Sequence, residues 1–243
     1  DILIEEGIRF VYNTVVEASS LPEGFDAYVL ATGTPEARDL KSVPGRELKG
    51  VHLAWELLSQ QNRILSGAEY SKDERVTCKG KDVLVIGGGD TGSDCIGTAH
   101  RQGCKSVTQI EIMPRPVEGP DDPKNPWPNY PRVLKTTSSH EEGCTRRWNI
   151  NTLEFIGKNG KLCGVRVQPI DWQPNPEGGR PLMVEAGDPE VIKCEACFLA
   201  MGFLKPQHPD YPDNVFVCGD ALNGASLVVR AMASGRDAAH KVD

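Results

Sequence analysis

Apolar runs of strand length alternate along this chain with polar turns that are rich in glycine. The clearest apolar run, residues 81–86, leads straight into Gly87-Gly88-Gly89. Cys95, Ile96 and Ala99 then recur at helical spacing, and a second apolar run follows at 106–113. The pattern predicts a strand, a tight turn, a helix over 93–102 and a second strand, which is typical of an α/β fold.

Other runs predict further elements on either side of this unit. Strands are expected at 8–17, at 26–34 and at 214–220, and helices at 53–63 and 221–241. Lys158-Asn159-Gly160 predicts a hairpin between strands at 151–156 and 161–170, and the runs 181–186 and 191–200 are expected to extend that antiparallel sheet. Seven of the 18 prolines fall between Pro114 and Pro131, which predicts a stiff connector. The chain thus divides into segments 1–50, 51–202 and 203–243.

The turn after the first apolar run carries the strongest chemical signal. Gly87, Gly89 and Gly92 have G-x-G-x-x-G spacing, which permits a tight turn, close approach of a pyrophosphate and close packing of helix on strand. The helix that follows offers unpaired N–H groups to phosphates. Glu111 lies 19 residues beyond Gly92, near where an acid that binds an adenosine ribose is expected. A dinucleotide cradle is favoured over a glycine turn that binds nothing.

The net charge and the lengths of the apolar runs limit the classes of partner that are expected. The 243 residues carry a net charge of −7, which argues against nucleic acid or an anionic membrane as the main partner. No run of 18 apolar residues predicts a membrane span. Because the chain begins at Asp1 without a methionine, we expect it to be a piece of something longer.

Several other residues are weaker candidates for chemistry. Cys194 and Cys197 would point to opposite faces of one buried strand, which favours unpaired thiols in a reducing compartment over a metal or redox pair. His140-Glu141-Glu142 is expected to be a solvated surface cluster. Arg146 and Arg147 are expected to shield a sheet edge or pair with acids, and the tryptophans to anchor core or loops. No catalytic nucleophile and no metal ligand are predicted.

The order of motifs resembles the flavoprotein reductases with two dinucleotide-binding domains. It runs from Ala31-Thr32-Gly33 through the glycine cradle to Ala200-Met201-Gly202 and Cys218-Gly219-Asp220. More narrowly, the segments 44–52, 87–94 and 226–229 are similar to the small (beta) subunit of glutamate synthase. Asn125–Arg132 and 140–142 resemble the single-chain NADH-dependent glutamate synthases.

The resemblance implies an oxidoreductase that passes hydride from NAD(P)H to FAD, and electrons onward to iron–sulfur clusters, for glutamate formation in ammonia assimilation. It implies a Rossmann-like nicotinamide-nucleotide domain at 51–202, with an antiparallel meander, inserted into an FAD-binding domain whose pieces are 1–50 and 203–243. It also implies a large subunit or fused synthase domain as partner. The setting would be cytoplasmic, or a plastid in a plant or alga.

The resemblance further assigns cofactor-binding residues. Expected at the nicotinamide nucleotide are Gly87, Gly88, Gly89, Asp90, Thr91, Gly92, Glu111, Ala200, Met201 and Gly202. Expected at FAD are Thr32, Gly33, Gly219, Asp220, Gly224, Ser226 and Leu227. Glu111 would repel a 2′-phosphate, so NAD(H) is expected to be preferred over NADP(H), with Arg115 softening that preference.

The departures from the family affect FAD and the iron–sulfur clusters. The cysteine-rich cluster ligands and the FAD-type glycine fingerprint of a full small subunit do not stand in this sequence, so the FAD site is expected to be incomplete. Two alternatives therefore remain beside the electron-input module. One is a related FAD/NAD(P) reductase that serves another partner, and the other is a truncated, non-catalytic nucleotide-binding module.

Overall fold

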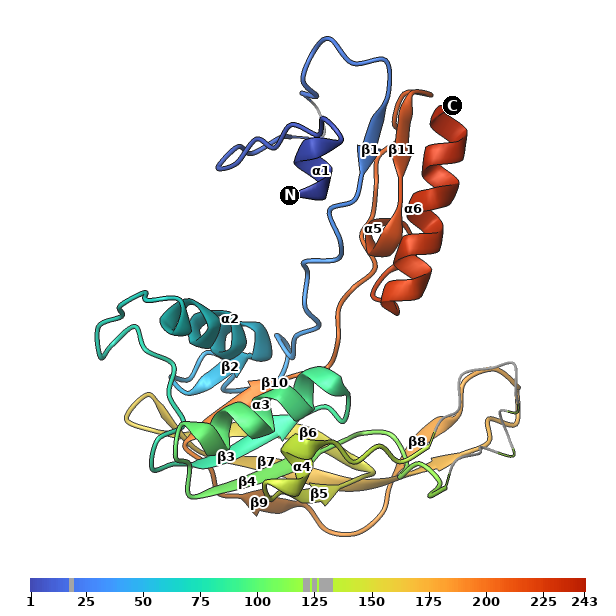
Figure 1. Ribbon diagram of the computed structural model, residues 1–243. Coiled ribbons are helices and arrows are strands. Elements are labelled where there is room, and N and C mark those ends of the chain that lie inside the picture. The colour runs from blue at the N-terminus through green and yellow to red at the C-terminus, as the bar shows by residue number, and fades with distance from the viewer. Residues whose placement is uncertain (18–19, 120–122, 124–125, 127–132) are drawn as a thin grey trace. The chain divides into compact units, whose positions relative to one another are not determined.

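The computed structural model describes residues 1–17, 20–119, 123, 126 and 133–243. They form two compact units (Figure 1). We call Asp1–Thr34 with Lys205–Asp243 the terminal unit, and Pro35–Leu204 the central unit. Much of the predicted proline-rich connector, and most of the Asn125–Arg132 motif, lie outside the described residues.

A parallel sheet organises the central unit. Its described strands run in the order β2 (Val51–Leu53), β10 (Ala196–Leu199), β3 (Asp82–Ile86), β4 (Ser106–Ile110) and β5 (Thr145–Arg147). Strand β3 is almost entirely buried because it is covered on both faces, as its continuous apolar run predicts. The predicted strand–turn–helix–strand unit is therefore confirmed.

Two helices cover one face of this sheet. They are α2 (Ala54–Leu65) and α3 (Asp90–Arg101), and the short α4 (Ser138–Glu141) packs beside α3. Alternate side chains of β3, Val83 and Val85, join the core under these helices, together with Leu57 and Ile96. The helix predicted at 53–63 is thus confirmed, and Gly103 adopts a positive φ of 80° just after α3 ends.

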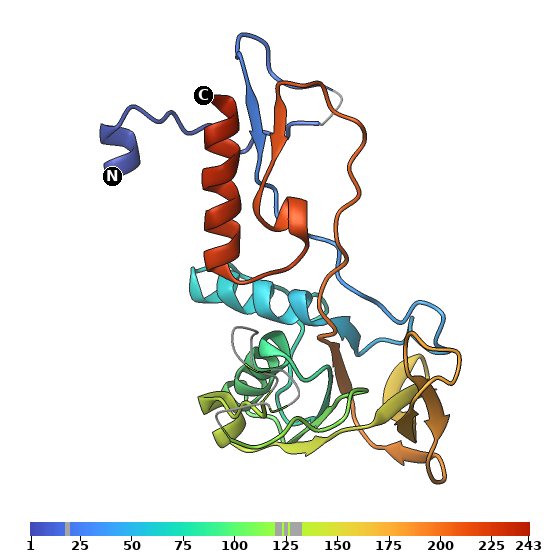
Figure 2. The same cartoon turned by 90° about the vertical axis from the view of Figure 1, so that its right-hand side faces the viewer.

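An antiparallel sheet covers the other face, so that helices, parallel sheet and antiparallel sheet form three layers (Figure 2). Its described strands are β6 (Ile150–Lys158), β7 (Lys161–Gln173), β8 (Leu182–Glu185) and β9 (Glu190–Ile192), the last two both paired with β7. The predicted hairpin is confirmed, with Asn159 and Gly160 at φ of 53° and 73° in its turn.

The segment 191–200 differs from the prediction. Only β9 extends the antiparallel sheet, because the chain turns at 193–195 and β10 then joins the parallel sheet between β2 and β3. This turn breaks the alternation expected of one strand. Cys194 and Cys197 consequently contribute to the same core cluster rather than to opposite faces.

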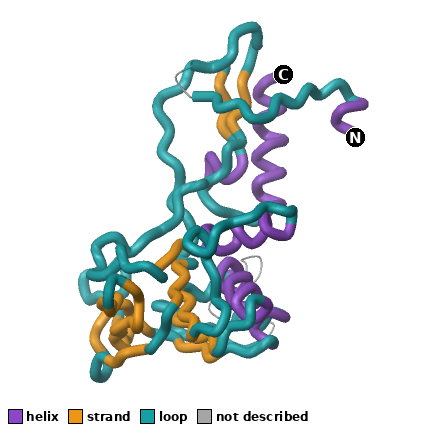
Figure 3. Tube along the Cα trace, turned by 90° about the vertical axis from the view of Figure 1, so that its left-hand side faces the viewer, coloured by secondary structure: helices purple, strands orange, loops and turns teal. Residues whose placement is uncertain are grey.

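The terminal unit has less described structure. Strand β1 (Tyr28–Leu30) pairs in parallel with β11 (Val215–Val217), and α6 (Val228–Val242) packs against β11 and α5 (Gly219–Asn223). Figure 3 shows these strands beside α6. The strand predicted at 8–17 is wrong, because those residues are exposed and follow α1 (Ile2–Glu5) as an irregular segment. The predicted helix at 221–241 is interrupted at Gly224–Leu227, where Gly224 has a φ of 80°.

Among the described helices, none has both the length and the apolar character needed to cross a bilayer.

Candidate nucleotide-binding site

The glycines after β3 differ in what surrounds them. A Cβ at Gly87, whose φ is 119°, would lie 2.2 Å from the carbonyl oxygen of Ala200, and one at Gly92 would lie 2.4 Å from that of Gly87. At Gly89, no described atom outside its chain neighbours and the adjoining helix backbone lies within 4 Å of such a Cβ. The outer two glycines are therefore required by the packing of the chain on itself, while Gly89 leaves open space.

Helix α3 begins at this opening. Gly89 is its N-cap residue, with extended backbone (φ −85°, ψ −173°), and no side-chain hydrogen bond caps the first turn. The leading N–H groups of a helix have no partner within the helix, and they form the positive end of its dipole. The start of α3 can therefore hold an anion beside Gly89.

The opening lies where the strand order of the sheet reverses. Strand β10 flanks β3 on one side and β4 flanks it on the other. Backbone hydrogen bonds continue past the strand ends, from Ala200 N–H to Ile86 (2.7 Å) and from Gly87 N–H to Ile110 (2.8 Å). In open α/β sheets, ligands bind outside the carboxyl ends of the strands at such a switch point.

Glu111 lies directly beside the glycine turn. Its Oε2 accepts the N–H of Gly88 at 2.6 Å, and its Oε1 accepts the N–H of Met113 at 3.0 Å. The carboxylate is thereby fixed next to the opening and keeps lone pairs for further donors.

A cavity of about 340 Å³, the first cavity, adjoins this side of the turn. Gly88, Gly89, Asp90 and Glu111 line it from the turn and from the end of β4. Trp148 and Arg146 line it from the segment of β5, and the guanidinium of Arg146 lies 5.1 Å from the centre of a Trp148 ring. Burial lowers the pKa of Arg146 from its ordinary value, and its buried Nε has no partner among the described atoms.

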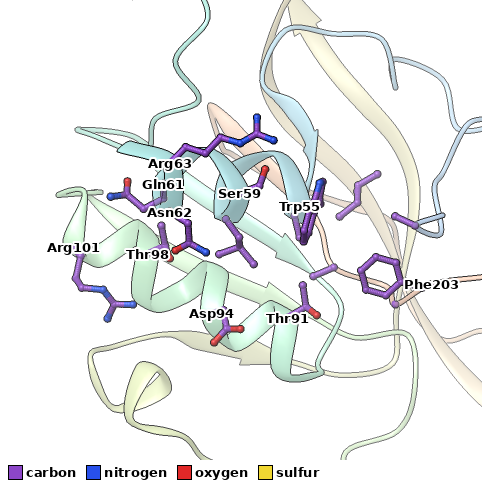
Figure 4. Close-up of a pocket in the computed structure, with 16 residues that line it drawn as sticks. Trp55, Ser59, Gln61, Asn62, Arg63, Thr91, Asp94, Thr98, Arg101 and Phe203 are labelled. Carbon is purple, nitrogen blue, oxygen red and sulfur yellow. The ribbon is translucent and has the colours of Figure 1, made fainter. Parts of the chain in front are cut away.

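A second cavity, of about 760 Å³, lies on the other side of the turn between α2 and α3. Thr91, Ala200 and Gly202 line it near the turn, together with Trp55 and Phe203. Figure 4 shows Trp55, Thr91 and Phe203 gathered at one end, while Gln61 and Arg101 lie at the other end of the groove. Met201 packs instead against the core beneath the sheet.

The residues expected at FAD belong to the terminal unit. Thr32 and Gly33 follow β1, and Gly219 and Asp220 begin α5. The N–H of Gly219 donates to Ser234 Oγ at 3.0 Å, and the hydroxyl of Ser226 donates to Asp220 Oδ1 at 2.6 Å. Gly224 ends α5, and Leu227 is the N-cap of α6.

His140 is not the solvated residue that was predicted. It is 9% exposed, and its ring contacts Thr137 and Gln109. Burial first, and the nearby charge of Arg146 second, lower the pKa of this imidazole. Arg147 pairs with Glu190, and pairing with an acid is one of the two roles that the sequence predicts for this arginine.

Cys194 and Cys197 are poor candidates for redox chemistry. All eight cysteines lie within the described residues, and none forms a disulfide. Burial raises the pKa of Cys194 to about 12 and that of Cys197 well above its ordinary value, so neither supplies a thiolate at neutral pH. No described group of three or more His, Cys, Asp or Glu residues is arranged to hold a metal ion.

Sequence reasoning missed several residues that line the two cavities. Trp55, Trp148 and Phe203 stand alone in the sequence, and no spacing rule relates them to the glycine turn. They reach it only through strand order and helix packing. The one available signal was position, since Phe203 directly follows the predicted Ala200-Met201-Gly202.

Comparison with known proteins gives consistent results. The sequence pattern of the pyridine nucleotide-disulphide oxidoreductase family matches residues 1–208. The small chain of an NADPH glutamate synthase from Mycobacterium tuberculosis is 39% identical over 94% of this chain and 51% of its own length. An NADH glutamate synthase from Schizosaccharomyces pombe is 33% identical over the whole chain but only 13% of its own length.

Among solved structures, FprA from Mycobacterium tuberculosis superposes with a TM-score of 0.66 at 14% identity, over 90% of this chain and 63% of its own. The chain spans about half the length of the small-chain relative it matches. The α/β fold and the resemblance to glutamate synthase small subunits, both expected from the sequence, are confirmed.

Proposed function

Since this chain belongs to the pyridine nucleotide-disulphide oxidoreductase family, we propose that it binds a nicotinamide dinucleotide across the start of α3 and serves as the electron-input module of a glutamate synthase-type flavoprotein. The observation that carries the proposal is the opening at Gly89. It adjoins an uncapped helix start and has a cavity on either side.

In the proposed complex, the pyrophosphate lies at Gly89, Asp90 and Thr91, where backbone N–H groups can donate to it. The adenosine half enters the first cavity, beside Glu111 and Trp148. The nicotinamide half enters the second cavity, beside Ala200 and Phe203. Trp55, which is 64% exposed, gives that cavity an apolar wall against which an aromatic ring can stack.

The reduced nicotinamide, when bound, supplies the hydride, so the chain needs no nucleophile or metal of its own. Its residues bind and orient the nucleotide at the carboxyl edge of the sheet. The apolar side chains of Trp55 and Phe203 line the second cavity and would shield a bound nicotinamide ring from water on one side.

We further propose that the chain prefers NADH to NADPH. Glu111 is held beside the adenosine end by two backbone N–H groups, and its carboxylate would accept from a ribose hydroxyl and repel a 2′-phosphate. Arg146 and Arg115 limit the preference, since both guanidinium groups lie over Trp148 near the same cavity. Relatives named for either nucleotide match this chain, so the residues at this cavity are the ones to test.

The residues expected at FAD fit that cofactor only in part. The single G-x-G-x-x-G run of the sequence is at 87–92. At the start of α5, the N–H of Gly219 already donates to Ser234, and the carboxylate of Asp220 already accepts from Ser226. We therefore propose that this chain alone binds nicotinamide nucleotide and little FAD. The acceptor flavin, the iron–sulfur clusters and the synthase partner would belong to the remainder of the assembly.

Calorimetric titration with NADH tests the central proposal. Gly89→Val places a side chain where the pyrophosphate would lie, and the protein has room for it there, so we expect folding without detectable binding. Gly235→Val in α6 is the matched control, because no described atom lies within 4 Å of a Cβ there either. Unchanged affinity in the Gly89 variant would contradict the assignment.

A further inference from the structure

A chain of buried polar side chains lies behind the glycine turn. Gln109, on β4, is 2% exposed, and His140, on α4, is 9% exposed. Gln109 Nε2 donates to the carbonyl oxygen of Gly87 at 2.9 Å, and its Oε1 lies 3.2 Å from His140 Nε2. The other ring nitrogen, Nδ1, lies 3.2 Å from the backbone nitrogen of Thr137 and 2.9 Å from its Oγ1.

These hydrogen bonds have one consistent direction. The N–H of Thr137 can only donate, so His140 Nδ1 must accept, and the proton of a neutral imidazole then lies on Nε2. That proton is donated to Gln109 Oε1, which directs the amide nitrogen of Gln109 toward Gly87. The Thr137 hydroxyl also pairs with Ser93 on α3, so these hydrogen bonds connect α4, β4 and α3.

This series of hydrogen bonds ends on one peptide group of the glycine turn. The Gly87–Gly88 peptide has its carbonyl held by Gln109 and its N–H held by Glu111, two residues beyond Gln109 in the sequence. Gly92 abuts the same carbonyl, since a Cβ there would lie 2.4 Å from it. The orientation of this peptide fixes the path of the backbone into Gly89, where the pyrophosphate is proposed to lie.

We infer that His140 is a positioning residue of the nucleotide site, which acts through Gln109 to fix the Gly87–Gly88 peptide. This inference rests on the proposed function for its ligand. Without a donor at position 140, the Oε1 of Gln109 loses its hydrogen bond, and nothing at this position then favours Oε1 over Nε2 of the amide. A rotated amide would place its oxygen against the Gly87 carbonyl, and the peptide would lose its donor.

Three variants and a control separate positioning from general stability. His140→Leu removes the donor, and Gln109→Met removes the amide. His140→Gln returns an amide N–H near the position of Nε2. Gln168→Met is the matched control, because Gln168 is also buried, at 3% exposed, and donates to the Pro169 and Gly187 carbonyls on the antiparallel sheet.

Two measurements are made on the full chain. In the first, NADH titration gives the dissociation constant. We expect His140→Leu and Gln109→Met to weaken binding roughly tenfold or more, His140→Gln to recover most of the affinity, and Gln168→Met to leave it unchanged. In the second, the amide proton of Gly88 is followed by NMR without nucleotide. The same two variants should shift its resonance and speed its hydrogen exchange, whereas Gln168→Met should not.

The outcomes distinguish the two proposals. If the unaltered chain binds no NADH, the proposed function fails. The resonance and hydrogen exchange of the Gly88 amide proton then still test whether His140 orients the turn. If NADH binds and His140→Leu leaves its affinity unchanged, the inference is overturned. An equal loss of affinity in Gln168→Met, or no recovery in His140→Gln, also overturns it, because the effect would then be one of stability alone.

Discussion

Two strand–turn–helix segments of this protein look alike in sequence and differ in structure. The first runs from β3 through Gly87–Gly89 into α3, and the second runs from β11 through Gly219 into α5. Strand β3 is central in a parallel sheet and almost entirely buried, whereas β11 pairs with β1 and is half-buried. Helix α3 has 12 residues, and α5 has five.

The two turns also differ in the partners of their polar groups and in the space around their glycines. At the first turn, neighbouring side chains hold the Gly87–Gly88 peptide from behind, and space is left in front at Gly89. At the second turn, Ser234 accepts the N–H of Gly219 and Ser226 donates to Asp220. A glycine and an acid after a strand therefore do not by themselves predict the surroundings of the turn. No side chain caps either helix start, but Gly89 leaves open space, whereas a Cβ at Gly219 would lie 3.7 Å from the Cβ of Ala231.

Substituting the strained glycine of each turn should give the largest difference between them. Gly87→Ala combines a φ of 119° with a Cβ 2.2 Å from a carbonyl oxygen, so we expect a loss of about 3–5 kcal/mol in the free energy of unfolding. At Gly219, with a φ of 62°, the nearest atom to a Cβ is 3.7 Å away, and the loss should be about 1–2 kcal/mol. Denaturant unfolding followed by circular dichroism measures both. Equal losses would remove the structural distinction between the turns.

The cofactors that the purified protein binds give the next test of the difference between the two turns. We expect the purified chain to bind NADH at the first turn and to show no flavin absorbance. A missing FAD cradle forfeits at least two charge-assisted hydrogen bonds, about 3–6 kcal/mol, or roughly two to four orders of magnitude in affinity. Joining the chain to the preceding half of a small-chain relative should restore flavin and NADH-dependent dye reduction together. A yellow 243-residue chain that reduces the dye would contradict the proposal.

The sequence predicts the first turn well because its signals are local. Gly87, Gly89 and Gly92 each have the surroundings that their spacing implies. Glu111, for which the sequence predicts a ribose contact, lies beside the turn and is hydrogen-bonded to Gly88, and its ribose contact stays a prediction. The apolar run of β3 and the hairpin at Asn159-Gly160 are likewise set by neighbouring residues.

The remainder depends on contacts between residues far apart in the sequence. Strand β10 joins β3 from more than a hundred residues away, so the run 191–200 alone did not reveal that it would leave the antiparallel sheet. His140 looked like a surface residue because its neighbours are acidic, yet Gln109 and Thr137 bury and bond it. Such partners are supplied by topology, which no local pattern encodes.

Substitutions beside the first cavity should change the nucleotide preference, by an amount smaller than the two effects above. Changing Glu111 to Ala together with Ile112→Arg and Met113→Arg removes the repulsion of a 2′-phosphate and adds cations. The ratio of NADPH to NADH affinity should rise roughly tenfold to a hundredfold, or about 1.4–2.8 kcal/mol. Loss of the Gly88 contact would weaken both nucleotides alike and leave the ratio unchanged, so Glu111→Ala alone separates the effect of the removed repulsion from that of the added cations. Tighter binding of NADPH than NADH by the unaltered chain would refute the proposed preference.

The smallest expected effect is a pH dependence of the free energy of unfolding, which comes from His140 behind the first turn. Burial, and then the charge of Arg146 on β5, lower the pKa of His140 below its ordinary value of 6.5. The other charged groups that line the same cavity are Asp90, Glu111 and Lys135. Between the lowered pKa and 6.5, the unfolded chain binds more protons than the folded one, so stability should fall as the pH drops below about 6.5 and should not change from this group above it.

His140→Gln removes the titrating group while keeping a donor for Gln109, and so isolates its contribution. Denaturation midpoints of both proteins at about pH 7.5 and about pH 5.5 should differ in their pH dependence, with the unaltered chain losing more on acidification. NADH affinity should follow the same direction, because a proton on Nδ1 would face the N–H of Thr137 and break the chain of hydrogen bonds that ends on Gly87. Identical acid sensitivity in the two proteins would mean that His140 does not titrate in this range, and the coupling between its protonation and the glycine turn would be ruled out.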